Sequence, residues 1–185
     1  MGLMDSLFGK AAESVKSAAA AAVNSAAQNS VTFTFDKLPD TLSELTSLPE
    51  AALDTPFKTA ALTMLALCRY PNDREAGKEM LNWLKGPRPL SPMEISFIND
   101  RFMDGKSYLP LSYFAGATPE NDYTPSRPYT ITITAGPYAY SQENYAKLDL
   151  RSGGADSPRQ LLMRKKADGT WALWEQYVLV GIRDP

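Results

Sequence analysis

The segment Ser152–Arg159, SGGADSPR, brings hydroxyl, carboxylate and guanidinium groups together with two adjacent glycines. Backbone amides next to glycines can approach an anionic or polar group, and an arginine beside them adds charge-assisted hydrogen bonds. We therefore predict a ligand-binding loop made by Ser152, Gly153, Gly154, Asp156, Ser157 and Arg159. A turn of purely structural use explains the same residues: the glycines would adopt positive φ, Asp156 would cap backbone amides, and Arg159 would pair with Asp156 or Glu175.

A second loop, residues 112–129, is rich in tyrosine, proline and glycine. Ordered loops of this length in small domains are often functional. Beside the first loop, it would form a pocket walled by Tyr113, Tyr123, Arg127 and Tyr129. Alternatively, the tyrosines cover an open sheet face and the prolines stiffen the crossing.

Carboxylates are the remaining groups suited to catalysis. A pair drawn from Glu120, Asp122 and Asp156 would serve as acid and base in a hydrolase centred on Asp156, or would hold a hard cation. No metal-binding spacing pattern accompanies these acids, and they stand among turn residues. We therefore assign no catalytic residue, metal ligand or cofactor, and expect a binding module rather than an enzyme.

Composition excludes several kinds of chemistry. The chain has no histidine, so catalytic sites that need an imidazole are impossible within it. Cys68 is the one cysteine and lies in the apolar run ALTMLALC, which excludes internal disulfides and CxxC redox pairs. We expect its side chain to be buried as a small apolar group.

Net charge and hydropathy indicate neither a nucleic-acid partner nor a membrane-spanning segment. The net charge is −2, and residues 145–185 carry seven basic and five acidic side chains. That small excess does not predict nucleic-acid binding. With neither an apolar run of membrane-spanning length nor a signal peptide, we expect a cytoplasmic protein.

Residues 1–30 differ from the rest in being rich in alanine. Alanine favours helix, so we predict a long helix over residues 3–27 whose bulky apolar residues are confined to its start. This arm would pack on its own domain, self-associate or bind a partner protein. Lys10 and Lys16 form only a sparse basic face, so a membrane surface is the least expected partner.

Three helices are predicted between residues 55 and 105. The start signals are Thr55–Pro56, Asn72 with Glu75, and Ser91–Pro92 with Glu94; Gly86 and Gly105 mark stops. Apolar residues at helical spacing follow each start.

Strands are predicted on both sides of these helices. The segments are 31–35, 129–135, 145–151, 159–166 and 170–182, and Asp168-Gly169 marks a hairpin between the last two. The last segment is apolar on both faces, which places it centrally or under cover on both sides. We predict an α+β fold, helices followed by a four- to five-stranded, mainly antiparallel sheet, in one domain over residues 31–185.

The later motifs resemble a family of uncharacterised bacterial proteins. The order of FAGATPENDYTPSRPY, YAKLDL, SGGADSPR, G-x-W-x-L-W-E and VGIRDP is similar to a domain of unknown function found among anaerobic Gram-positive bacteria. The resemblance covers about residues 31–185 and implies no activity, cofactor or site. Together, these observations predict a non-catalytic binding or protein-interaction module that uses the two loops. The alternatives are the carboxylate hydrolase or cation-binding enzyme, and a peripheral membrane or self-assembling protein acting through the N-terminal helix.

Overall fold

The computed structural model describes residues 29–185, so the helix predicted for residues 3–27 lies outside the described part of the chain. Its helices are α2 (Leu42–Thr46), α3 (Pro56–Arg69), α4 (Arg74–Lys85) and α5 (Pro92–Arg101), with short 3₁₀ helices η1 (Pro49–Ala52), η2 (Leu111–Tyr113) and η3 (Pro119–Asn121). Its strands are β1 (Ser30–Phe35), β2 (Tyr129–Ala135), β3 (Tyr145–Leu150), β4 (Arg159–Lys165) and β5 (Trp171–Gln176). The predicted α+β arrangement is confirmed over this range.

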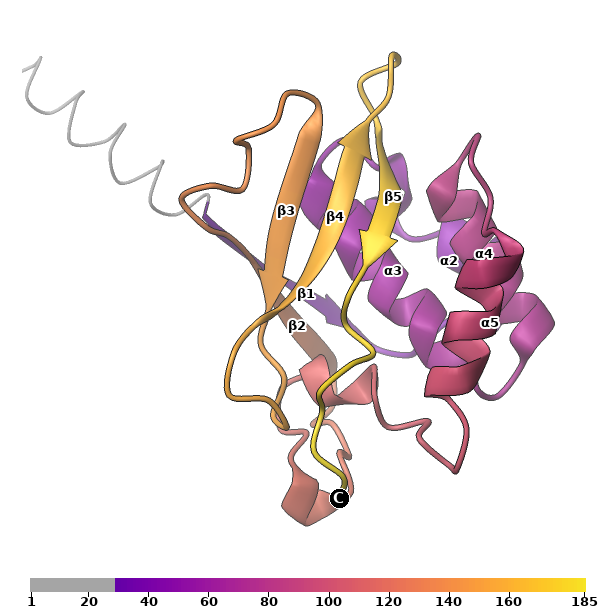
Figure 1. Cartoon of the computed structure of the whole chain (residues 1–185), viewed down its shortest axis with the longest axis vertical. Coiled ribbons are helices and arrows are strands. Elements are labelled where there is room, and N and C mark those ends of the chain that lie inside the picture. Colours follow the sequence, from indigo (N-terminus) through magenta and orange to yellow (C-terminus); the bar gives the residue numbers. More distant parts are fainter. Residues whose placement is uncertain (1–28) are drawn as a thin grey trace, which may run out of the picture. The chain divides into compact units, whose positions relative to one another are not determined.

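The five strands form one sheet in the order β1-β2-β3-β4-β5, with β2 to β5 joined antiparallel to one another (Figure 1). α3 packs across β2 to β5, and α4 packs on β5. Because α3 is in contact with so much of the sheet, nearly its whole length is buried. Cys68 lies in this buried helix, as predicted, and burial raises the pKa of its thiol.

The helix starts follow local capping, with one correction. Thr55 accepts from the Lys58 amide at the start of α3, and Ser91 and Glu94 form the predicted capping box of α5. The cap of α4 is Asp73, which accepts from the Ala76 amide, and not Asn72. Both residues are good caps, and spacing alone did not separate two neighbouring candidates.

The last strand differs from its prediction. β5 ends at Gln176 and lies at an edge of the sheet, not at its centre. Leu162 pairs with Glu175 and Met163 with Leu173, so Trp174 is an extra, bulged residue. Bulges are common at sheet edges, and this one interrupts the alternation that a regular strand would show.

Groups from outside the sheet form hydrogen bonds with the backbone groups of β5 that point away from β4. The Trp171 amide donates to the Leu53 carbonyl (2.8 Å), and the Trp171 carbonyl accepts from the Thr59 hydroxyl (3.0 Å). Lys85 Nζ donates to the Trp174 carbonyl (3.1 Å). The helical layer thus holds the edge strand by hydrogen bonds as well as by apolar packing. None of the helices between residues 29 and 185 has the length and apolar character needed to cross a lipid bilayer.

Candidate functional site

The Ser152–Arg159 loop is fastened to η2 by hydrogen bonds. Ser152 Oγ lies 2.8 Å from Ser112 Oγ and accepts from the Gly154 amide (3.0 Å). The Gly153 amide donates to the Ser112 carbonyl (2.8 Å). The two predicted loops are therefore in contact, but several of their hydrogen-bonding groups bind each other and are not available to a ligand.

The two glycines are required for close approach. A Cβ atom at Gly153 would lie 2.0 Å from the Ala117 carbonyl oxygen, and one at Gly154 would lie 1.9 Å from the Tyr123 hydroxyl oxygen. Neither glycine has positive φ, so the expectation of a positive-φ turn is wrong. Lack of a side chain lets the loop pack directly against residues 117–123.

Arg159 holds the C-terminal segment, which we define as residues 177–185. Its Nε donates to the Val180 carbonyl (2.8 Å) and its Nη2 to the Gly181 carbonyl (2.7 Å), while Nη1 donates to Ser157 O and Oγ (3.0 Å each). The expected ion pair of Arg159 with Asp156 or Glu175 is therefore wrong. Backbone carbonyls 21 and 22 residues away take its donors instead.

Two predicted wall tyrosines also bind the C-terminal segment. The Tyr113 hydroxyl donates to the Val178 carbonyl (2.6 Å), and the Tyr123 hydroxyl donates to the Arg183 carbonyl (2.7 Å). Burial raises the pKa of both hydroxyls. Arg127 points elsewhere and lies over the Tyr129 ring, 4.3 Å from its centroid.

The three candidate carboxylates singled out from the sequence lie at the protein surface. Asp156 is paired with Arg183 (2.9 Å), but its side chain is 92% exposed. Hydrogen bonds from its own backbone amide and from Thr118 lower the pKa of Glu120, the wrong direction for a general acid. Asp122 closes η3 in the left-handed conformation. Within residues 29–185, no three histidine, cysteine, aspartate or glutamate side chains are grouped to hold a metal ion.

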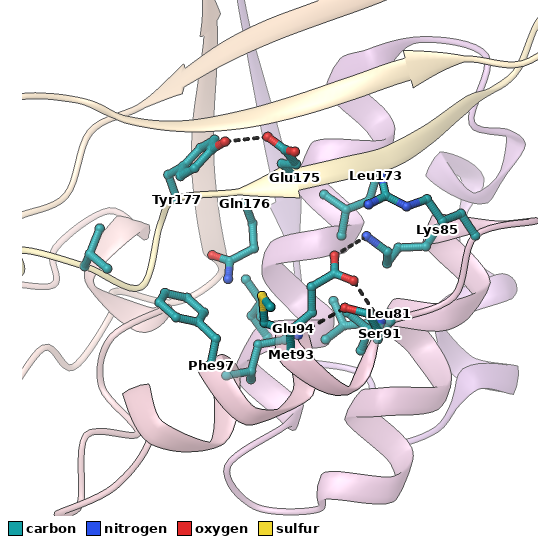
Figure 2. Close-up of a pocket in the computed structure, with 15 residues that line it drawn as sticks. Leu81, Lys85, Ser91, Met93, Glu94, Phe97, Leu173, Glu175, Gln176 and Tyr177 are labelled. Atoms are coloured by element: carbon teal, nitrogen blue, oxygen red, sulfur yellow. Dashed lines mark hydrogen bonds and ion pairs between the residues drawn. The ribbon is translucent and has the colours of Figure 1, made fainter.

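A different part of the domain contains a cavity of about 500 Å³. It lies between α4, α5, the end of β5 and the start of the C-terminal segment, as Figure 2 shows. Its apolar lining comes from Leu67, Leu81, Leu90, Met93, Phe97, Ile98, Leu173 and Val180. Met93, Phe97 and Tyr177 are exposed, Met93 to 81%, so the cavity has an apolar rim.

An ion pair crosses one side of this cavity. Lys85 Nζ lies 2.7 Å from Glu94 Oε1, and the Lys85 side chain is only 2% exposed. Glu94 Oε2 also accepts from the Ser91 amide (2.8 Å). Burial raises the pKa of Glu94, but the hydrogen bonds from Lys85 and Ser91 lower it more, to about 2. Both charges are therefore kept, and each is compensated by the other.

Two arginines flank Trp174 beside the cavity. The guanidinium carbon of Arg88, a residue that lines the cavity, is 4.3 Å from the indole centroid, and that of Arg164 is 4.7 Å from it. Tyr145 meets the same ring edge-on, with centroids 5.7 Å apart. This group of side chains is an aromatic and cationic cluster at the β5 edge.

Sequence reasoning missed the cavity residues for identifiable reasons. Glu94 was explained by its capping role, and Arg88 stands in a loop with no recognisable motif. Lys85 did carry a signal, because it is four residues after Leu81 on the apolar face of α4. A lysine at a buried-face position requires a carboxylate or carbonyl partner.

Comparison with known proteins gives a family but no activity. No curated protein and no solved structure matches the chain. The family described as Domain of unknown function (DUF6935) matches residues 37–185, which include the helices α2 to α5, both loops and the cavity. Since the match covers most of the chain, this protein is a member of the DUF6935 family.

Proposed function

We propose that the protein is a non-catalytic binding module that holds a small, mainly apolar molecule in the cavity between α4, α5 and β5. The observation that carries this proposal is the cavity itself, about 500 Å³ in volume and lined mostly by apolar side chains. Small-molecule sites typically measure about 300–1,000 Å³ and combine apolar walls with a few placed polar groups.

The state of three charged groups in the cavity, Lys85, Glu94 and Glu175, supports a mainly apolar occupant, whereas Arg88 keeps an unpaired charge. Lys85 and Glu94 neutralise each other, and Glu175 accepts a hydrogen bond from the Tyr177 hydroxyl. Occupied donors and acceptors gain little from a polar ligand. The exposed apolar atoms at the rim, by contrast, gain free energy when a ligand removes them from water.

The loops remain our second candidate, for a polar or anionic group. A more open hollow of about 280 Å³ is lined by Tyr113, Arg151, Ser152 and Gly153, among other residues. Arg151 would supply the positive charge, because the guanidinium group of Arg159 is hydrogen-bonded to the C-terminal segment. The hydrolase centred on Asp156 has less support, because that carboxylate is almost fully exposed and already paired with Arg183.

Three further predictions from the sequence stand beside this proposal. They are a bacterial origin, a cytoplasmic location, and a partner protein or self-association through residues 3–27.

Titration of the full chain with the neutral dye 1-N-phenylnaphthylamine tests the cavity. We expect saturable binding at one site, seen as a rise in dye fluorescence. Val180→Phe should fill the cavity and Phe97→Ala should remove part of its rim, so each should weaken binding about tenfold, since burying an aromatic or aliphatic side chain is worth roughly 1.5–3 kcal/mol.

Tyr138→Ala is the matched control. Tyr138 is 82% exposed on the loop between β2 and β3 and does not line the cavity, so its removal takes away an exposed aromatic ring elsewhere. Equal loss of dye binding in Phe97→Ala and Tyr138→Ala would contradict the proposal, as would undiminished binding in Val180→Phe. Circular dichroism establishes that each variant is folded.

A further inference from the structure

We infer that the cavity ligand is an amphiphile with a carboxylate head, and that Arg88 binds this head beside Trp174. This inference rests on the proposed function, since it adds a polar subsite to the apolar cavity. It names the chemical class of the ligand: a single apolar chain that ends in an oxyanion.

The position of Arg88 places positive charge at the cavity. Arg88 lines it, and the guanidinium groups of Arg88 and Arg164 each lie within 5 Å of the Trp174 centroid. They are consequently no more than about 9 Å from each other. Arg88 also stands between Pro87 and Pro89, which restrict the backbone that carries it.

The charges of both arginines are uncompensated. In the described part of the chain, neither guanidinium takes part in an ion pair or donates a hydrogen bond to another residue. Lys85, the other cation of the cavity, is already neutralised by Glu94. An anion that enters the cavity would therefore find its free positive charge at Arg88, since Arg164 does not line the cavity.

The hydrogen-bond donors of Arg88 are available to a ligand. A guanidinium group carries five N–H donors in its plane, and in the described part of the chain those of Arg88 bind no other residue. The contact of Arg88 with the Trp174 ring therefore helps to place the guanidinium group without taking up its donors. Guanidinium edges match carboxylates in bidentate geometry, which favours this head over a hydroxyl or an ammonium.

Glu175 defines which end of the cavity suits the head. Its carboxylate is turned toward Tyr177, from which it accepts a hydrogen bond (Figure 2). A ligand carboxylate near Tyr177 would meet this like charge, whereas one at Arg88 would meet a cation. The apolar chain would then extend from Arg88 toward Phe97 and Val180, which also line the cavity.

Isothermal titration calorimetry of the full chain with decanoate and with decan-1-ol tests the inference. We expect decanoate to bind about tenfold more tightly than decan-1-ol, because hydrogen bonds to a charged group are worth roughly 1.5–3 kcal/mol. Arg88→Gln should weaken decanoate binding about tenfold and leave decan-1-ol binding unchanged, whereas Arg164→Gln, which lies outside the cavity lining, should leave both unchanged. Arg74→Gln, at the exposed first residue of α4, removes one positive charge elsewhere and should change neither.

The outcomes separate this inference from the function on which it rests. Equal affinity for decanoate and decan-1-ol, with no effect of Arg88→Gln, overturns the carboxylate subsite but leaves the apolar cavity as a binding site. Failure of both compounds to bind the wild-type chain overturns both proposals. A loss of decanoate binding in Arg74→Gln equal to that in Arg88→Gln shows a general charge effect and also overturns the subsite.

Discussion

Lys85 and Glu94 are joined by a 2.7 Å ion pair that links the last residue of α4 to the first turn of α5. The pair is unequal, because the lysine side chain is 2% exposed and the glutamate side chain 30%. Lys85 also donates to the Trp174 carbonyl, so one ammonium group connects two helices and the sheet edge. The position of α5, and with it one wall of the cavity, depends on this contact.

Removing the glutamate charge should destabilise the domain more than removing the lysine. Glu94→Gln keeps an acceptor for the Ser91 amide but leaves a buried ammonium without a counterion, which should cost about 3 kcal/mol in the free energy of unfolding. Lys85→Met leaves a glutamate that water can reach, so we expect about 1 kcal/mol. Urea denaturation of both variants and of the double variant measures these values. A double variant whose loss equals the sum of the two single losses would contradict direct coupling.

Stability should fall in acid because of the same carboxylate. Glu94 has a pKa of about 2 in the folded chain against an ordinary value of 4.5, so the unfolded chain takes up its proton first as the pH is lowered. The contribution is fully present above about pH 5 and is lost as the pH falls toward 2, and it amounts to roughly 3 kcal/mol.

Melting temperatures of wild type and Glu94→Gln between pH 7 and pH 2.5 check the acid effect. Asp54, Asp73 and Asp168 also have lowered pKa values because of hydrogen bonds from neighbouring residues, so a smaller slope should persist in the variant. Parallel curves for the two proteins would show that Glu94 does not cause the loss.

Substitutions of Gly154 and Gly169 should lower the free energy of unfolding by different amounts, because glycine is needed at the two positions for different reasons. Gly154→Ala places a Cβ 1.9 Å from the hydroxyl of the fully buried Tyr123, so it should cost about 3 kcal/mol, at the upper end of overpacking effects. Gly169 has positive φ and open space around it, so Gly169→Ala should cost only about 1 kcal/mol. Thermal unfolding of both variants makes the comparison, and equal losses would count against the close packing of the Gly154 loop.

Arg159→Ala should release the C-terminal segment. It removes the donors that hold the Val180 and Gly181 carbonyls, and we expect a loss of about 2 kcal/mol together with faster hydrogen exchange at residues 178–183. Arg183→Ala breaks only an exposed ion pair with Asp156, so the loss should stay below about 0.5 kcal/mol. If the two variants exchange alike, Arg159 is not the main anchor of this segment.

Local signals predicted most of the fold. Thr55 and the Ser91–Glu94 box fixed two helix starts, and the alternation over residues 129–135 gave β2, because caps and period-two patterns depend on neighbouring residues. The position of β5 at the edge of the sheet could not be predicted from patterns among neighbouring residues. Its second apolar face includes Trp174, whose ring packs with Arg88, Arg164 and Tyr145 without a covering layer of helix.

Contacts between distant residues account for what sequence reasoning missed in the site. Arg159 was singled out as a binding residue, but its partners at Val180 and Gly181 are visible only once the C-terminal segment is placed. The cavity draws its lining from residues 67 to 180, and no window of the sequence contains more than a part of it. Whether the Ser152–Arg159 loop binds a ligand stays a prediction.

The hydrogen bonds along β5 also bear on how this domain meets other copies of itself. An edge strand with unused backbone groups is a template for strands of other molecules, and such pairing starts aggregation and strand exchange. On β5, Leu53, Thr59 and Lys85 already take up outward groups of Trp171 and Trp174. A foreign strand would have to displace all three contacts, so strand-by-strand growth of this sheet from β5 is disfavoured.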